Sequence, residues 1–317
     1  MRKIVSIVFI CSVILFAGCS KKEVKQEGVT TNNSNTLSAA GTGDKDKNFK
    51  IQYAPPRMVY KVEEADLDNN GKDEYIVFSI ANDTLNKTAH QFYKFDMMEV
   101  FVKDSVNNSY RKIAIDTVDF SNEYWIMNLE KDKSKQIIIK TDMGGNDAVN
   151  SRGMYVFNYA SDKINLVKYF DTGNPEVKDV NGDGNKEILV SDSFFGILPE
   201  AGAVYYTSEI YKYGDGKLNQ SNKEFKNYFL GKASDALAEY NKVKDRINKG
   251  EKIKTSEYLL YKKAAEIILA YSAAEDYSLI SKFWSDDNTF LQKNLEDDEY
   301  QDLKKFISKL PPIANTI

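Results

Sequence analysis

Two stretches of sequence decide the fold of this chain: residues 65–79, ADLDNNGKDEYIVFS, and residues 178–192, KDVNGDGNKEILVSD. A third stretch, residues 127–141, reads MNLEKDKSKQIIIKT and aligns with both without a gap. The three starting points lie 62 and 51 residues apart. In each copy a polar, acidic loop runs directly into a short β-branched or aliphatic run, which is typical of a strand. An internal repeat therefore organises the middle of the chain.

Each copy continues with two further strand-like segments. The first set is MMEVFVKD, GMYVFNY and YTSEIYKYG, and the second is YRKIAIDTVD, INLVKYF and KLNQ. A unit of one loop and three strands predicts a β-propeller blade or a similar stack of sheets. Three sheets are too few to surround a channel, so we expect an open, partial propeller of about three blades, or association of copies. The predicted class is α+β.

The two most similar loops carry oxygen-bearing side chains at alternate positions. Positions 1, 3, 5, 7 and 9 are Asp66, Asp68, Asn70, Lys72 and Glu74 in one loop, and Asp179, Asn181, Asp183, Asn185 and Glu187 in the other. Position 6 is glycine in both, which permits a sharp turn. Ca²⁺ requires six to eight oxygen ligands, and position 7 contributes its backbone carbonyl, so Lys72 is compatible with a site. The pattern predicts structural calcium.

Position 12 excludes an EF-hand, because that motif needs a bidentate glutamate there and these loops have Val77 and Val190 within strands. The loops resemble those of FG-GAP or VCBS-type repeats, found in the integrin alpha-chain propeller and in many bacterial surface proteins. The resemblance covers about residues 58–215. It implies that each loop leads into a blade and that the metal stiffens a turn. The same residues also form good metal-free hairpin turns, which is the competing interpretation.

The middle loop departs from this pattern. It keeps oxygens at alternate positions, but Lys133 replaces the glycine, and Lys131 and Lys135 add positive charge; its alternate residues are Asn128, Glu130, Asp132, Ser134 and Gln136. We expect a vestigial loop that holds no metal.

The N-terminus has the layout of a bacterial lipoprotein signal. Arg2 and Lys3 precede an apolar run, which is shorter than the roughly 20 residues that span a bilayer, and Ala17-Gly18 precede Cys19. The resemblance implies cleavage after residue 18 and a lipid on Cys19 that holds the protein at the outside of the bacterial cell membrane. Residues 19–48 are polar and lack aromatic residues, which predicts a flexible tether. We expect a β domain at 49–220 and a helical region at 221–317.

The apolar period changes from 2 to 3.6 after about residue 221. One stripe runs from Phe225 to Ile247 and ends at Asn248-Lys249-Gly250. A second runs from about residue 256 to Trp284, where Asp286-Asp287 is expected to end the helix, and a third covers residues 291–307. Core packing is the expected role of these stripes, with a partner-binding groove as the alternative; the helices would form a bundle or cap the open sheets.

Composition excludes several kinds of chemistry. The chain has 317 residues, one histidine (His90) and two cysteines, Cys11 and Cys19, both in the N-terminal segment. The rest therefore has no thiol and no multi-histidine metal site. Without residues 1–18 the chain has 41 basic and 47 acidic residues, a net charge of −6, which offers no basic surface for nucleic acid. We found no phosphate loop, dinucleotide fingerprint, GxSxG or HExxH motif.

These observations predict a binding or adhesion module with an unknown protein or glycan ligand and no catalytic residues. A carboxylate-based, carbohydrate-active hydrolase or its accessory domain, and a structural envelope or assembly factor, are the alternatives. Aromatic residues that alternate along strands are the candidates for stacking on a sugar or peptide, and about half should be core: Tyr155, Phe157, Tyr159, Tyr205, Tyr206, Tyr211 and Tyr213.

Overall fold

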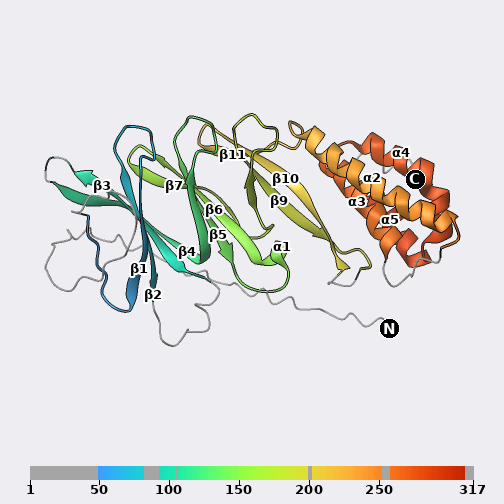
Figure 1. Cartoon of the computed structure of the whole chain (residues 1–317), viewed down its shortest axis with the longest axis horizontal. Helices are drawn as coiled ribbons and strands as arrows, with labels where there is room; N and C mark the ends of the chain where they lie inside the picture. The colour runs from blue at the N-terminus through green and yellow to red at the C-terminus, as the bar shows by residue number, and fades with distance from the viewer. Residues whose placement is uncertain are drawn as a thin grey trace, which may run out of the picture. The chain divides into compact units, whose positions relative to one another are not determined.

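The computed structural model describes residues 49–81, 93–104, 106, 108–198, 202–251 and 258–310. These residues form a β-rich part followed by helices, which confirms the predicted α+β class (Figure 1). The strands are β1 (Arg57–Ala65), β2 (Glu74–Ala81), β3 (Phe95–Asp104), β4 (Ser109–Met127), β5 (Gln136–Asp142), β6 (Arg152–Ala160), β7 (Lys163–Phe170), β8 (Glu176–Lys178), β9 (Glu187–Phe194), β10 (Val204–Gly214) and β11 (Lys217–Gln220). The helices are α1 (Ala148–Ser151), α2 (Lys226–Asn248), α3 (Leu259–Ala273), α4 (Tyr277–Asn294) and α5 (Asp297–Ser308).

The strands pair antiparallel in two sheets, and neither sheet closes on itself. One has the order β1-β2-β3-β4-β5-β6-β7 and the other the order β11-β10-β9-β8. The long strand β4 changes partner along its length. Residues 109–117 pair with β3, residues 123–127 pair with β5, and Ser121 pairs with both. Phe120, at the change, has a φ of 57°, a left-handed conformation that turns the strand.

This change of partner divides the strands into three groups of four. The first strand group is β1 to β3 with residues 109–117 of β4, the second is residues 123–127 of β4 with β5 to β7, and the third is β8 to β11. In each group an acidic loop joins the first strand to the second. The repeat in the sequence is therefore a repeat of four strands in space, one strand more than the sequence pattern indicated.

Separate apolar cores lie between neighbouring groups. Ile76 and Phe78 of the first group share one core with Ile137 and Ile139 of the second. Ile138 points to the opposite face of β5 and shares the next core with Ile188 and Val190 of the third group. Strands in this arrangement are covered on both faces, which is why they read as continuous apolar runs in the sequence. Leu189 of β9 faces a further core shared with Phe229 of α2 and Ala273 of α3.

The outer face of the first group is also covered. Tyr75, Val77 and Phe101 form a core with Phe49, Ile51 and Tyr53, which precede the first strand. The Phe49 ring stacks on Tyr75 with 4.5 Å between ring centroids. The Tyr53 hydroxyl donates to Glu99, which is buried on β3 and also pairs with Lys112.

The predicted stripe on α2 is confirmed as core. Phe229, Ala233, Ala236, Tyr240 and Val243 are buried, and the helix ends at Asn248 as expected. The helix α3 contacts both α2 and β10, and most of its side chains are buried. The helices therefore pack on each other and on the third strand group.

Three predicted helix boundaries are wrong. The third stripe, residues 291–307, is not one helix, because α4 ends at Asn294 and α5 begins at Asp297. The second stripe is divided at Glu275, whose φ of 53° ends α3, and Asp276 caps α4 by accepting a hydrogen bond from the Leu279 N–H. Asp286-Asp287 does not end a helix but lies within α4. Asp287 is buried and pairs with Lys244 of α2, so an acidic pair expected to break the helix instead connects two helices.

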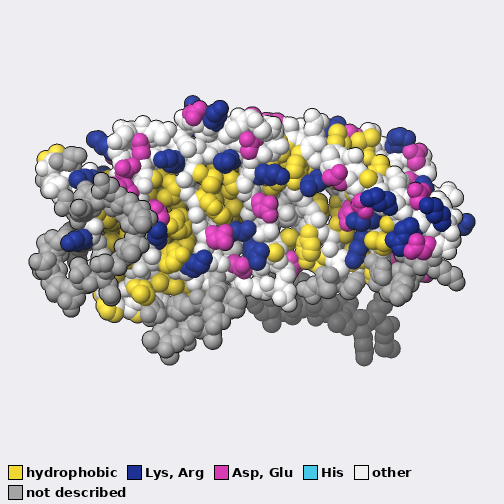
Figure 2. All heavy atoms as spheres, in the orientation of Figure 1, with side chains coloured by type: hydrophobic (Ala, Val, Ile, Leu, Met, Phe, Trp, Pro, Cys, Tyr) yellow, Lys and Arg dark blue, Asp and Glu magenta, His cyan; other side chains and the backbone are white. Residues whose placement is uncertain are grey.

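The alternating aromatic residues are mostly core. Phe157, Tyr159, Tyr211 and Tyr213 are buried, whereas Tyr205 is half exposed. Figure 2 shows hydrophobic side chains at the surface over the strands, with acidic and basic side chains interspersed among them. None of the described helices is both long enough and apolar enough to cross a membrane.

Candidate metal-binding loops

The three acidic loops share one hydrogen bond at equivalent positions. We call residues 66–74 loop 1, residues 128–136 loop 2 and residues 179–187 loop 3. In each, the backbone N–H at position 2 donates to the side chain at position 9. The donor–acceptor distances are 2.9 Å for Leu67 to Glu74, 2.8 Å for Leu129 to Gln136 and 2.9 Å for Val180 to Glu187. The middle loop thus has the same local fold as the other two.

The first carboxylate organises the backbone of loops 1 and 3. Asp66 accepts from the N–H groups of Asn70 and Gly71 at 3.0 and 2.8 Å. Asp179 accepts from Gly182 and Gly184 at 2.7 and 3.0 Å. The glycines at position 6, Gly71 and Gly184, have φ values of 81° and 90°, which explains why glycine is needed there.

Three carboxylates of loop 1 converge. One oxygen from each of Asp66, Asp68 and Glu74 lies within 4.8 Å of the other two, and this is the only such group of three acidic, histidine or cysteine residues in the described part of the chain. Glu74 is buried. Burial raises its pKa, and the charges of Asp68 and Asp66 raise it further, against the hydrogen bond from Leu67. A bound cation would offset this mutual repulsion.

In loop 3 one buried carboxylate oxygen has no hydrogen-bond partner. Glu187 is fully buried; its Oε2 atom accepts from Val180, but its Oε1 atom has no hydrogen-bond partner. Burial raises the pKa of Glu187, and Asp183 and Asp179 raise it further. A buried oxygen without a partner is unfavourable and is uncommon in folded proteins, so a cation bound at Oε1 would satisfy a group that the chain itself leaves unpaired.

The amide side chains predicted as ligands are engaged within the loops. Asn70 donates to Asp68 at 3.0 Å and accepts from the Lys72 N–H at 2.8 Å. Asn181 donates to Asp183 at 2.9 Å and accepts from the N–H of the same residue. These bonds are those of side-chain-mediated turns, as in the metal-free interpretation. The residues that fit a cation best are therefore Asp66, Asp68 and Glu74 in loop 1, and Glu187 in loop 3.

Asn185 has a different neighbour. Its side-chain oxygen accepts from the backbone N–H of Lys131 in loop 2 at 2.9 Å. Asn185 in loop 3 and Lys72 in loop 1 are predicted to bind calcium through their backbone carbonyls. The contact with Lys131 involves the side-chain oxygen of Asn185 and not this carbonyl. The Lys72 side chain is exposed.

The middle loop satisfies its own position 9. The Gln136 side chain accepts from Leu129 through its oxygen and donates to the Ser134 carbonyl through its nitrogen at 2.9 Å. The Gln136 nitrogen donates where the second oxygen of a carboxylate could not, so this side chain has a partner for both polar atoms without a cation. Asn128 at position 1 donates to the Lys133 carbonyl. These bonds fit the prediction that loop 2 holds no metal.

The loops are also joined to one another in a row. The N–H at position 8 of each later loop donates to the carbonyl at position 2 of the loop before it. These bonds are Lys135 to Leu67 at 2.8 Å and Lys186 to Leu129 at 2.7 Å. Asn69 of loop 1 also donates to the Lys133 carbonyl of loop 2 at 2.9 Å. Sequence reasoning missed this row; the constant spacing from loop to strand is the signal that could have indicated it.

The predicted lipidation site, Cys19, lies outside the described residues, as do Cys11 and His90. In the comparisons with known proteins, no family model matches the chain and no curated protein is similar to it. The assignment of function therefore depends on the sequence patterns and on the geometry of the loops.

Proposed function

We propose that this chain is a lipid-anchored, extracytoplasmic binding module built on a calcium-stabilised, FG-GAP/VCBS-like repeat scaffold. The observation that carries the proposal is the hydrogen bond from position 2 to position 9, which recurs in all three loops and ends on a buried carboxylate in loops 1 and 3. Neutral glutamine replaces the carboxylate only in the loop that lost the other features of a calcium site.

A partial propeller of three blades is the architecture that we propose for the scaffold. Its support is the order of the layers: each strand group has four antiparallel strands, and neighbouring groups share an apolar core. The helices pack against the face of the third group where a fourth blade would otherwise lie. The helical region would then act as the cap of an unclosed stack.

Calcium is the cation that the donor set favours. The proposed ligands are carboxylate, amide and carbonyl oxygens at alternate positions, without nitrogen or sulfur donors. In loop 1 they would include Asp66, Asp68 and Glu74, and in loop 3 Asp179, Asp183 and Glu187. The ion would stabilise the turn into the second strand of each group.

Thermal unfolding of the full-length chain tests the calcium part of the proposal. At a free calcium concentration about 100-fold above its dissociation constant, one site adds about 2.7 kcal/mol of stability. That corresponds to an increase in Tm of about 5–10 °C for a domain of this size. EGTA should reverse the increase, and equal magnesium should give less of it. Identical melting curves with calcium and with EGTA would contradict the proposal.

The anchor has a separate test. A radiolabelled fatty acid should be incorporated into the wild-type chain but not into a Cys19→Ala variant expressed in the same bacterial cells. A Cys11→Ala variant is the matched control, because Cys11 lies within the segment that cleavage would remove. Equal labelling of the Cys19→Ala variant and the wild type would refute lipid attachment at Cys19.

A further inference from the structure

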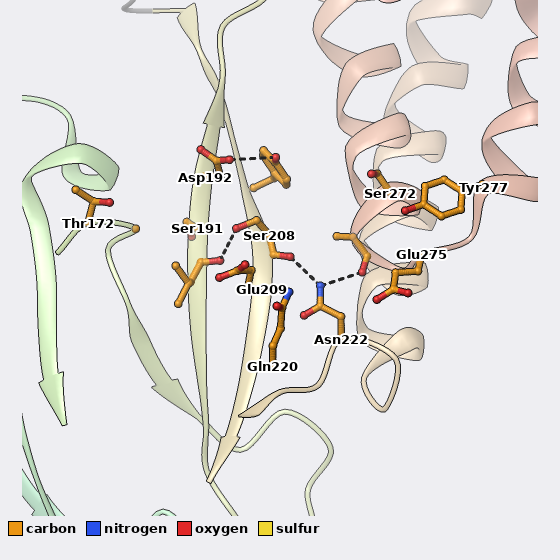
Figure 3. Close-up of a pocket in the computed structure, with 14 residues that line it drawn as sticks. Thr172, Ser191, Asp192, Ser208, Glu209, Gln220, Asn222, Ser272, Glu275 and Tyr277 are labelled. Atoms are coloured by element: carbon orange, nitrogen blue, oxygen red, sulfur yellow. Dashed lines mark hydrogen bonds between the residues drawn. The ribbon is translucent and has the colours of Figure 1, made fainter. Parts of the chain in front are cut away.

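A polar cavity of about 490 Å³ lies between the third strand group and the helices. Strands β9 and β10 supply Asp192, Tyr206 and Glu209, and the segment from α3 to α4 supplies Glu275 and Tyr277. Figure 3 shows Asp192 and Glu209 on the strands and Glu275 and Tyr277 on the helical side. The volume is in the range of small-molecule sites and is separate from the acidic loops.

The wall that joins the sheet to the helices is fixed by Asn222. This buried side chain accepts from the Ile210 N–H at 2.9 Å and donates to the carbonyls of Ser208 and Ala273 at 2.8 and 3.1 Å (Figure 3). The oxygen and the amide nitrogen of the Asn222 side chain are therefore both engaged, and they link β10 to α3. The cavity is therefore held in place before any ligand arrives, which lowers the entropic cost of binding.

The lining has one sign of charge. It includes three carboxylates, those of Asp192, Glu209 and Glu275, and none of its fourteen residues is Lys, Arg or His. The Lys223 ammonium is 3.3 Å from Glu275, but the Lys223 side chain is 81% exposed, so the pair is weak and easily exchanged. A positively charged ligand would complement this lining.

Two of the carboxylates act on one hydroxyl group. Tyr206 donates to Asp192 at 3.5 Å. Burial, followed by the charges of Asp192 and Glu209, raises the pKa of Tyr206 to about 12. The hydroxyl therefore stays protonated at neutral pH and donates to Asp192.

The carboxylates are spread around the cavity and do not form a metal site. In the described part of the chain only the loop 1 carboxylates converge within 4.8 Å as a group of three. The cavity lining instead includes six hydroxyl groups, from Thr172, Ser191, Tyr206, Ser208, Ser272 and Tyr277, and the Gln220 amide. Such a lining matches a ligand with several hydroxyl groups.

We propose that this cavity binds an amino sugar with a free, positively charged amine, which would be held beside Tyr206 by Asp192 and Glu209, while Glu275 adds negative charge from the segment between α3 and α4. The hydroxyl groups of the lining would bind the hydroxyl groups of the sugar. This inference rests on the proposed role as a binding module and names the ligand class and the site.

Isothermal titration of the full-length chain with glucosamine, in saturating calcium, tests the proposal. Glucose and N-acetylglucosamine are the matched neutral ligands. Glucosamine should bind at least about tenfold more tightly than either, since a charge-assisted hydrogen bond to a carboxylate is worth about that much. The difference should shrink as salt is added. Equal affinities for the three sugars, or no binding of glucosamine, would overturn the inference.

Substitutions locate the site. The double variant Asp192→Asn/Glu209→Gln should weaken glucosamine binding about tenfold or more, and Glu275→Gln should weaken it less, whereas Asp235→Asn, on the exposed face of α2, should leave it unchanged. Unchanged affinity in both cavity variants would place any binding elsewhere and refute the site. Melting curves with and without calcium distinguish the two proposals: a retained calcium-dependent rise without glucosamine binding rejects only the cavity assignment.

Discussion

Replacing Glu187 by glutamine should give loop 3 the same residue at position 9 as loop 2. Gln136 accepts from Leu129 and donates to the Ser134 carbonyl, whereas Glu187 accepts from Val180 and leaves its second oxygen without a partner. A glutamine at 187 in the same rotamer would place its amide nitrogen toward the carbonyl of residue 185, which is position 7 like Ser134. The variant should be more stable than wild type without calcium and less responsive to calcium.

The size of both effects follows from the contacts. The substitution removes an unpaired buried carboxylate oxygen, whose cost is about 1–3 kcal/mol, and adds one hydrogen bond with a net value of about 1 kcal/mol. We expect a gain of about 2–4 kcal/mol in EGTA, which is about 4–16 °C in Tm. In saturating calcium the variant should lose the contribution of one site, about 2.7 kcal/mol at 100-fold excess over the dissociation constant.

Circular dichroism melting curves of the full-length chain, each in EGTA and in calcium, measure both quantities. The matched control is Glu176→Gln on the neighbouring strand β8, where the side chain is exposed and no acidic loop is involved. It should behave like wild type in both conditions. A Glu187→Gln variant that melts below wild type in EGTA and keeps the full calcium-dependent rise would refute both expectations. The Oε1 atom of Glu187 would then be neither an unpaired atom nor a calcium ligand.

Two further predictions concern the helical region. Gly196 has a φ of 52°, and an added Cβ would overlap the Tyr261 hydroxyl. Gly196→Ala should therefore lower the free energy of unfolding by about 1–3 kcal/mol, measured by urea unfolding. Gly250→Ala is the control; its φ is 85° but the space around it is open, so it should lose less. Asp276 caps α4 and pairs with Lys226 at 2.8 Å, and hydrogen bonds from Lys226 and Ser278 lower its pKa. Its contribution is therefore present above the unfolded-state pKa of about 3.9 and is lost as the pH falls through the lower folded-state value. Asp276→Ala should cost about 1 kcal/mol at neutral pH, and Asp276→Asn should keep the cap but remove this acid-dependent loss. An unchanged acid profile in Asp276→Asn would contradict the assignment.

The local part of the fold could be predicted from the sequence. Alternate oxygens followed by an apolar run correctly predicted each loop and the strand after it, with a glycine at position 6 in loops 1 and 3, since loop and strand are set by nearby residues. The stripe on α2 was also local and correct. The break at Glu275 was missed because a left-handed residue between two apolar helices leaves the 3.6-residue period almost unchanged. Asp287 was misread because its partner, Lys244, lies 43 residues away.

The candidate sites were predictable to different degrees for the same reason. Spacing alone indicated the candidate ligands of loops 1 and 3, but the unpaired Oε1 atom of Glu187 depends on burial by other strands. The cavity could not be predicted, since Asp192, Glu209 and Glu275 come from a strand pair and a helix boundary that only the tertiary fold brings together.

An unclosed stack of sheets must cover its two outer faces, and this chain does so with segments of different kinds. Phe49 and Tyr53, ahead of the first strand, cover Tyr75 and Phe101 of the first group. At the other end Leu189 and Ile210 are covered by α2 and α3. Residues that include several aromatic side chains cover one end of the stack, and helices cover the other. The polar cavity lies between the third strand group and the helices. The covering of the third strand group by helices, in place of another sheet, therefore accounts both for the end of the stack and for the presence of a polar cavity between strands and helices.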